Sequence, residues 1–319
     1  MATVLVFLDS PGEELHNAER ELLALAGSLG EPTVALTHQP STGFLEILGG
    51  FAVATVYIPA AEDTIRDVLV AGKAAVLAAA ATASRADVVL LGNSYEAKEV
   101  AARAGIRLNS GVITDAVGVD SDLTVTKSVL AGAYTVRARV QTGSAIITVK
   151  PNSFHALEPG LPGDPAQPRT VDLPAIGAVQ AAQITGRTAK PVSGRPELTE
   201  ARVVVAGGRG VDGNFAPLEE FADLLGGAVG ASRAATDAGW IEHSAQIGQT
   251  GKTVSPQLYV SAGISGAIQQ KAGMQTSQVI VAINKDADSP VFEIADFGIV
   301  GDLFTVLPQA SAELRKRRG

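Results

Sequence analysis

The sequence predicts an α/β protein of two domains, each with a mostly parallel sheet flanked by helices. Short apolar runs recur along the chain, and alanine-rich or amphipathic stretches of helical period separate several of them. Strands that alternate with helices in this way favour parallel sheets whose faces are covered by the helices. The chain has 319 residues, which is the length of two ordinary domains.

The composition indicates a folded protein and argues against several functional classes. Hydrophobic residues make up 46% of the chain and charged residues 18%. The net charge of -8 argues against nucleic-acid binding, which needs a basic surface. Because the chain has no cysteine, disulfides, thiolate metal sites and a cysteine nucleophile are excluded. The four histidines have no ligand spacing, so no metal site is predicted.

The N-terminal residues are typical of a first strand and not of a signal peptide. They lack a basic region and reach Asp9 after few apolar residues. The longest charge-free apolar run, residues 74–84, is too short to span a bilayer. We therefore expect a soluble cytoplasmic protein with no stable membrane insertion.

The first domain is predicted over residues 1–190. Its strands are expected at residues 4–8, 34–37, 53–58, 88–91 and 112–116. An apolar helical repeat follows the first strand and ends at Gly30. Asn93 or Ser94 is predicted to cap a helix. The more strand-like stretch 123–149 predicts an antiparallel edge on the same sheet.

A proline-rich boundary separates the two predicted domains. Half of the 16 prolines fall between residues 151 and 196, a density that long helices and central strands do not tolerate. We place the boundary within residues 190–198, so that the second domain covers residues 195–319.

The second domain is predicted to hold five apolar strands, each ending in a polar or glycine-rich turn. The strands are expected at residues 203–206, 228–230, 258–262, 279–283 and 297–300. Ligands of an open parallel sheet bind beyond the carboxyl ends of its strands. The five turns are therefore predicted to converge on one cofactor site of a Rossmann-like domain.

Residues 248–270 contain two glycine turns on either side of one of these strands. Two backbone cradles one strand apart favour a large phosphate-bearing cofactor. The second turn is expected to enter a short helix at Ser265, whose free N–H groups and dipole favour an anion.

A dinucleotide fingerprint in the same domain gives an alternative function. Gly208 to Gly213 match G-x-G-x-x-G after a strand, but Ser232 and Arg233 stand where the acidic partner of a ribose is expected. An arginine there suits a 2′-phosphate, so an NADP-dependent oxidoreductase stays the alternative.

Residues 248–253 also resemble a Walker A phosphate-binding loop, but this interpretation is rejected. Residues 248–253 have its lysine and threonine, but Gln246 replaces the required first glycine. Pro256 also lies where the following helix would have to continue.

Seven short motifs follow one another over residues 207–304: GGRG, VGASRA, DAGW, IGQTGK, SPQLYVSAGISGAIQ, AINKD and ADFGIVGDLF. Together they resemble the α subunit of electron transfer flavoprotein, also called the FixB family. GIRLNSGVITDAV and VRARVQTGSAIITV in the first half resemble that family's N-terminal domain more loosely. The resemblance implies one FAD, bound mostly in the second domain, and a heterodimer with a β subunit that holds a structural AMP.

The resemblance also implies an electron carrier without a substrate reaction of its own. It would accept electrons from acyl-CoA dehydrogenases and related enzymes and pass them to a membrane quinone reductase through one-electron flavin states. No catalytic residue is expected, since acid–base and nucleophilic groupings are absent from the predicted turns. A bifurcating relative that uses NADH in the partner subunit stays open.

The motifs carry over a set of cofactor contacts. Arg209 would lie near the phosphates or the adenosine of FAD. Ser232 would lie beside the cofactor, and Arg233 against the isoalloxazine ring, where its permanent charge would favour an anionic flavin. The IGQTGK motif would wrap the flavin through Ile247, Gly248, Gln249 and Thr250, with Thr250 near N5.

The remaining contacts come from the later motifs. A helix N-terminus would face the pyrophosphate through Ser265, Gly266, Ala267, Ile268, Gln269 and Gln270. The ribityl and adenosine end would be closed by Asn284, Asp302 and Leu303. Where the family commonly has a histidine that is thought to donate to flavin O2, this sequence has Gln270. Because an amide can donate this bond but cannot carry a proton charge, we expect retained FAD binding with a less stabilised anionic semiquinone.

Overall fold

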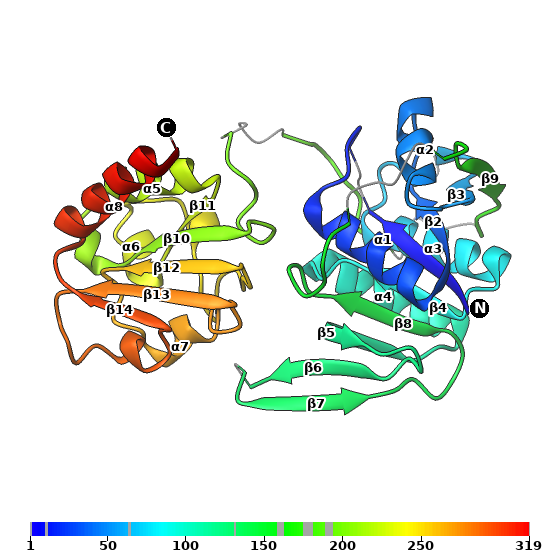
Figure 1. The fold of residues 1–319 in the computed structure, drawn as a ribbon. Coiled ribbons are helices and arrows are strands. Elements are labelled where there is room, and N and C mark those ends of the chain that lie inside the picture. Colours follow the sequence, from blue (N-terminus) through cyan, green and yellow to red (C-terminus); the bar gives the residue numbers. More distant parts are fainter. Residues whose placement is uncertain are drawn as a thin grey trace. The chain divides into compact units, whose positions relative to one another are not determined.

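The protein folds into two compact units, each built on one β-sheet (Figure 1). The computed structural model describes residues 2–9, 12–62, 65–130, 132–157, 163–174, 181–188 and 194–318. The first unit is formed by residues 1–127 and 135–189, and the second mainly by residues 190–319. The predicted α/β class is confirmed. The predicted boundary at residues 190–198 lies partly outside the described residues.

The first unit contains a sheet of nine strands in the order β7-β6-β5-β8-β4-β1-β2-β3-β9. Its elements are β1 (Ala2–Leu8), α1 (Asn17–Leu29), β2 (Gly30–Leu36), α2 (Thr42–Gly49), β3 (Thr55–Pro59), α3 (Val70–Ser84), β4 (Val88–Leu91), α4 (Tyr95–Leu108), β5 (Val112–Val119), β6 (Val125–Val129), β7 (Tyr134–Ala138), β8 (Ala145–Val149) and β9 (Gln167–Val171). Successive residues of β1 point to opposite faces: Val6 packs in the cluster with α1 and α2, and Phe7 in the cluster with α3 and α4.

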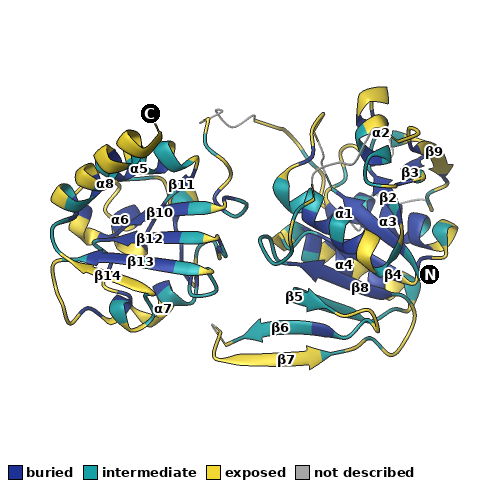
Figure 2. Cartoon of the chain, in the orientation of Figure 1, coloured by how far each residue is buried: buried dark blue, intermediate teal, exposed yellow. Residues whose placement is uncertain are grey.

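The structure corrects the predicted antiparallel edge at residues 123–149. β6 does pair antiparallel with β5. β8, however, pairs in parallel with both β4 and β5, and all of its residues are buried. Figure 2 shows the contrast between buried β8 and exposed β7. A short apolar run fits an edge strand and an interior strand equally well, so the sequence could not place β8.

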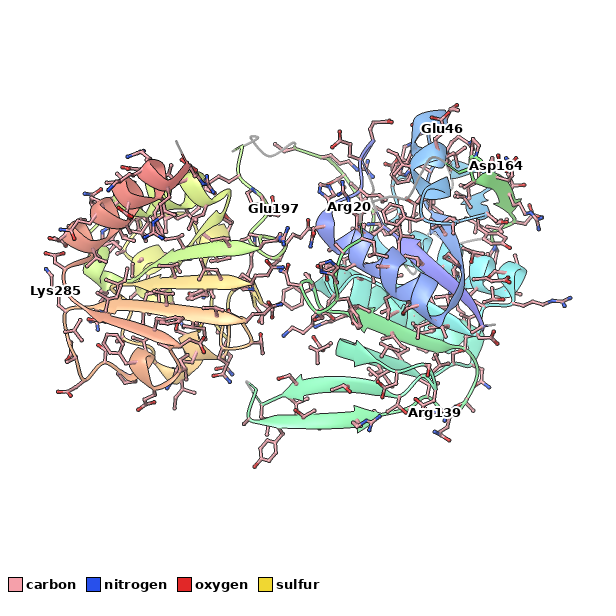
Figure 3. The ribbon with its side chains drawn as sticks, in the orientation of Figure 1. Arg20, Glu46, Arg139, Asp164, Glu197 and Lys285 are labelled. Atoms are coloured by element: carbon pink, nitrogen blue, oxygen red, sulfur yellow. The ribbon has the colours of Figure 1, made fainter. Side chains whose placement is uncertain are left out.

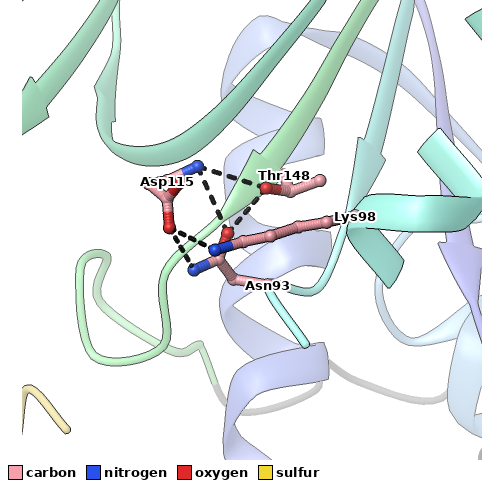
Figure 4. Close-up of polar contacts among 4 residues, drawn as sticks. All are labelled: Asn93, Lys98, Asp115 and Thr148. Carbon is pink, nitrogen blue, oxygen red and sulfur yellow. Dashed lines mark hydrogen bonds and ion pairs between the residues drawn. The ribbon is translucent and has the colours of Figure 1, made fainter. Parts of the chain in front are cut away.

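α4 begins at the predicted cap. The Ser94 hydroxyl accepts a hydrogen bond from the Ala97 N–H at 3.0 Å, so this half of the expectation is confirmed. Asn93 has another role: its side chain donates to Asp115 and accepts from Thr148, at 2.9 and 2.6 Å (Figure 4). Lys98 adds an ion pair to Asp115 at 2.6 Å. This network holds Asp115 at a φ of 62°, a left-handed conformation that is uncommon outside glycine.

The second unit contains a fully parallel sheet of five strands in the order β11-β10-β12-β13-β14. Its elements are β10 (Val203–Gly207), η2 (Arg209–Val211), α5 (Ala216–Leu225), β11 (Ala228–Ala231), α6 (Arg233–Asp237), η3 (His243–Ala245), β12 (Leu258–Ala262), α7 (Ile268–Lys271), β13 (Val279–Asn284), η4 (Pro290–Glu293), β14 (Phe297–Val300) and α8 (Leu303–Arg318). The five predicted strands are all present.

The two faces of this sheet have separate cores. Val260 of β12 packs in a cluster with residues of α5 and α8, which lie side by side in Figure 1. Tyr259, its neighbour, belongs to the cluster on the other face, with Ile247 and Met274. None of the helices in the described part of the chain combines the length and the hydropathy that a bilayer span needs.

Candidate functional site

Two glycine turns touch where β10 meets β12. Gly208 and Gly210 donate backbone hydrogen bonds to Ala262 and Gly263, both at 3.0 Å. A Cβ on Gly208 would lie 2.3 Å from the Gly263 carbonyl oxygen, and Gly263 has a φ of +63°. β10 has β11 on its other side, so the strand order reverses here. Open α/β sheets bind their ligands at such a point.

A cavity of about 730 Å³ lies at this place, within the volume range typical of ligand sites. The turns that follow all five strands contribute to its wall. The residues from these turns are Arg209, Gly210, Ser232, Arg233, Ala234, Gly263, Ile264, Ser265, Asn284, Lys285, Asp286, Gly301 and Leu303. The IGQTGK segment and α7 contribute further residues to the wall.

Most of the sequence-predicted site residues line this one cavity. These are Arg209, Ser232, Arg233, Ile247, Gly248, Gln249, Thr250, Ser265, Ala267, Gln269, Gln270, Asn284 and Leu303. Gly266, Ile268 and Asp302 are not among the lining residues. Gly266 packs against the backbone of Val291, and Ile268 is 76% exposed.

Two backbone contacts bring residues 247–250 to the cavity. The Ile247 N–H donates to the Ala231 carbonyl at 2.8 Å, at the end of β11. The Gln249 N–H donates to the Gln269 carbonyl at 2.7 Å, which joins this loop to α7. Lys252 does not line the cavity, and its Nζ lies 3.6 Å from Glu197 Oε2. β12 and not a helix follows this loop, in agreement with the rejection of a P-loop.

The structure corrects the start of the predicted helix. α7 begins at Ile268 and not at Ser265: residues 265–267 are not helical, Gly266 has a φ of +85°, and the Val291 N–H of η4 donates to the Ser265 carbonyl at 2.9 Å. Throughout the described chain, the backbone N–H groups of residues 265–269 find no acceptor. These five donors, three of them on lining residues, suit the oxygens of a phosphate group.

Two arginines line the cavity. Arg233 begins α6 and pairs with Asp237 at 3.1 Å, and its side chain is 69% exposed. Arg209 is exposed and has no ion pair with any described residue. Ser232, which precedes Arg233 in the sequence and also lines the cavity, has a buried hydroxyl with no hydrogen-bond partner in the described part of the chain. An unpartnered buried hydroxyl is costly without a ligand, so its position beside the cavity fits a polar occupant.

Gln270 lies on the cavity wall and is hydrogen-bonded to a buried tyrosine of the sheet. Its Nε2 donates to the Tyr259 hydroxyl at 3.0 Å, and both side chains are buried. Burial raises the pKa of the Tyr259 hydroxyl, which stays neutral. Gln270 Oε1 has no partner among the described residues. It is a second orphaned polar atom on the wall.

Two predicted residues have structural partners. The Asn284 amide donates to the Ile264 carbonyl at 2.9 Å and accepts from the Asp286 N–H at 3.0 Å, so it ties two of the turns together. Asp302 accepts from the Phe304 N–H at 2.9 Å at the start of α8 and pairs with Lys285 at 3.1 Å (Lys285 is labelled in Figure 3). These contacts shape the turns around the cavity.

Sequence reasoning missed Gln246, which lines the cavity and is 8% exposed. The sequence identifies it only as the residue that replaces a P-loop glycine. A polar residue just before a glycine turn and next to a buried isoleucine is a weak signal, so its hydrogen bonds to Thr236 and Thr250 could not be foreseen. Lys285, Asp286 and Ser289 were also missed as lining residues.

The chain is similar to known proteins over its whole length. Residues 4–191 match the electron transfer flavoprotein domain model, and residues 197–275 match the electron transfer flavoprotein FAD-binding domain model. The chain is 43% identical over 323 residues to the electron transfer flavoprotein subunit alpha of Mycobacterium leprae, with 100% of both chains covered. The protein of the same name from Paracoccus denitrificans is 36% identical over 317 residues, covering 98% of this chain and 100% of that protein. That from Syntrophomonas wolfei is 35% identical over 324 residues, covering 99% and 100%.

Proposed function

Because the chain belongs to the electron transfer flavoprotein α subunit family and carries its FAD-binding domain, we propose that it works as the FAD-bearing half of a heterodimer with a β subunit. The β subunit would hold a structural AMP. The heterodimer would take electrons from acyl-CoA and other dehydrogenases and pass them to a membrane flavoprotein-quinone reductase, working from the cytoplasm. The chain itself is an electron carrier, and FAD supplies the redox chemistry when bound.

The domain roles follow from this proposal. Residues 195–319 would hold FAD, and residues 1–190 would contact the β subunit. The observation that carries the proposal is the convergence of all five strand-end turns on one 730 Å³ cavity whose wall has unpartnered donors and acceptors. FAD is a large ligand with both phosphate oxygens and a polar ring edge, so it fits such a wall.

Each part of the wall suits one part of the cofactor. The free N–H groups of residues 265–269 would bind the pyrophosphate, and Arg209 would add charge near the phosphates. Arg233 would lie against the isoalloxazine ring, and Thr250 would donate a hydrogen bond to it. Ile247, Gly248 and Gln249 would wrap the ring, while Asn284 and Leu303 would close the ribityl and adenosine end.

Co-expression with the β subunit tests the proposal. We expect a yellow complex that releases one FAD per heterodimer on denaturation. It should be reduced in stopped flow by an acyl-CoA dehydrogenase with its substrate, and reoxidised by the quinone reductase. A colourless complex that binds NADPH, or a yellow complex that no dehydrogenase reduces, would contradict it.

Arg233→Ala tests the ring assignment within that complex. Removal of a permanent positive charge should lower the flavin midpoint potential by tens of millivolts, while Arg233→Lys keeps part of the effect. Arg315→Ala is the control, since Arg315 pairs with Glu220 and is not among the lining residues. An unchanged potential in Arg233→Ala would contradict this role.

A further inference from the structure

Three side chains form a hydrogen-bonded chain that ends at the cavity. The Thr236 hydroxyl donates to Gln246 Oε1 at 3.2 Å, and Gln246 Nε2 donates to the Thr250 hydroxyl at 3.0 Å. Thr236 is 2% exposed and Gln246 is 8% exposed, whereas Thr250 is exposed on the cavity wall. The chain therefore runs from the core to the surface that would meet the cofactor.

The backbone holds the last two members of this hydrogen-bonded chain, Gln246 and Thr250, in register. The Lys252 N–H donates to the Gln246 carbonyl at 2.8 Å, and the Gly251 N–H to the Gly248 carbonyl at 3.1 Å. A Cβ on Gly251 would lie 2.4 Å from the Gln246 carbonyl oxygen, so the turn is tightly closed. The turn thus sets the distance between Gln246 and Thr250.

The donor-to-acceptor direction of these hydrogen bonds decides whether Thr250 can donate or only accept a hydrogen bond in the cavity. A threonine hydroxyl has one proton to donate and lone pairs to accept with. Since the Gln246 amide donates to Thr250, that proton is not used by Gln246. No described residue accepts it, so it is available to a group in the cavity. We propose that Gln246 is a positioning residue that holds Thr250 as a hydrogen-bond donor toward FAD.

This inference rests on the proposed contact between Thr250 and the flavin, and it goes further by naming the residue that sets the polarity of the contact. The Thr236 hydroxyl also lies 3.0 Å from the Arg233 carbonyl, so its proton is shared between two acceptors. With a reversed Gln246 amide, Thr236 would donate to Arg233 alone and Thr250 would donate to Gln246 Oε1, so that Thr250 could only accept a hydrogen bond from a group in the cavity. The property to test is therefore whether Thr250 acts as a donor or as an acceptor toward the cavity.

A double-mutant cycle in the heterodimer tests the coupling between the two residues. FAD is removed, and its dissociation constant is measured by fluorescence quenching on rebinding to the wild type, Gln246→Met, Thr250→Val and the double variant. Loss of one hydrogen bond predicts about tenfold weaker binding in each single variant. We expect the double variant to bind no more than about twofold more weakly than either single variant, since both remove the same bond.

Matched variants separate positioning from packing. Thr250→Ser should recover most of the affinity that Thr250→Val loses. Thr236→Val, which leaves the cavity wall untouched, should weaken binding severalfold in the wild type but not in the Thr250→Val background. Gln246→Glu, which as a carboxylate can only accept, should turn the Thr250 proton away and shift the flavin absorption band in the same direction as Thr250→Val. Melting temperatures of all variants report whether the fold is kept.

Several results would overturn the inference. Losses that multiply in the double variant would mean that Gln246 and Thr250 act independently. Unchanged affinity and spectrum in Gln246→Met, Gln246→Glu and Thr236→Val would remove the positioning role. An unaffected Thr250→Val would also overturn it, although FAD binding, and with it the proposed function, would stand. A wild-type complex without FAD would overturn both.

Discussion

Gln270 donates a hydrogen bond to Tyr259 at 3.0 Å, at a point where the tyrosine has no exposed surface. Tyr259 lies on a central strand and Gln270 on the short α7, so this bond fixes one wall of the cavity to the sheet. In Tyr259→Phe the buried amide loses its partner, and we expect unfolding to become easier by roughly 1–3 kcal/mol in urea titration.

Tyr57→Phe is the control for this change. Tyr57 is also buried, at 6% exposed, but its hydroxyl has no hydrogen bond to any described residue. We expect its free energy of unfolding to change by less than about 0.5 kcal/mol. Equal losses in the two variants would show that the Gln270 bond contributes nothing.

Gln270→His should change the flavin potential. Like the amide, an imidazole can donate the hydrogen bond that is expected at flavin O2, and below its pKa it also carries a positive charge. We expect the two one-electron midpoint potentials to move apart in Gln270→His, and titration of the imidazole to add a pH dependence beyond that of wild type and Gln270→Asn. Spectroelectrochemical titration between pH 5 and pH 8 measures this. Identical potentials in wild type and Gln270→His would refute the expectation.

Gly208→Ala should disrupt the contact between the two glycine turns. Its Cβ would lie 2.3 Å from the Gly263 oxygen and 2.8 Å from Ile264 Cα, both backbone atoms that cannot give way alone. We expect sub-stoichiometric FAD and a lower melting temperature, corresponding to about 2 kcal/mol or more. Gly27→Ala, in α1 with nothing within 4 Å, should leave the bound FAD unchanged. Full FAD content in Gly208→Ala would contradict the close approach.

Glu21 predicts a loss of stability as the pH rises. Burial raises the pKa of its carboxyl to about 7, although Asn17 and backbone N–H groups hydrogen-bond to it. A carboxyl whose pKa is higher in the folded than in the unfolded protein stabilises the fold at low pH, and this contribution is lost between about pH 4.5 and 7. We expect a decline of roughly 3 kcal/mol over that window.

Glu21→Gln should abolish that decline. The amide keeps the shape of the neutral carboxyl, so the variant should be more stable than wild type at pH 8 and similar to it at pH 4. Glu313→Gln, an exposed position on α8, is the control. Denaturant unfolding at several pH values measures the slopes, and parallel curves for wild type and Glu21→Gln would contradict the prediction.

The depressed pKa of Asp115 predicts the opposite pH dependence in acid: the free energy of unfolding should fall as the pH is lowered. Its partial burial favours the neutral form, but hydrogen bonds from Lys98 and Asn93 outweigh this and lower the pKa to about 2 (Figure 4). A depressed pKa stabilises the fold above the unfolded value of about 4, and the contribution disappears as the pH falls toward 2. Since the side chain is 34% exposed, screening reduces the effect to about 1 kcal/mol.

Asp115→Asn separates this charge effect from the backbone. Asparagine tolerates the left-handed conformation at this position, so the variant should fold normally. We expect it to be less stable than wild type at pH 6 and to lose less stability between pH 4 and pH 2. Acid unfolding followed by circular dichroism measures this, and equal acid slopes in the two proteins would count against the network.

Local pattern was enough to predict the five strands of the second sheet. Leu258–Ala262 and Phe297–Val300 begin and end where the sequence places them, because turn residues flank each apolar run. The same reasoning failed for β8, whose neighbours in the sheet are distant in sequence. It also began α7 too early, since the contact of Ser265 with Val291 could not be known.

For the site, the order of the residues was enough to predict the glycine turns, the two arginines and the family. How these residues meet became visible only in the folded protein: which turns share one cavity, that Tyr259 holds Gln270, and that Gln246 joins Thr236 to Thr250. Hydrogen bonds between side chains depend on distances that are set by packing across the sheet. The glycine stretch at residues 248–270 was enough to locate the site. The hydrogen bonds of this stretch with the neighbouring strand ends give the cavity its shape.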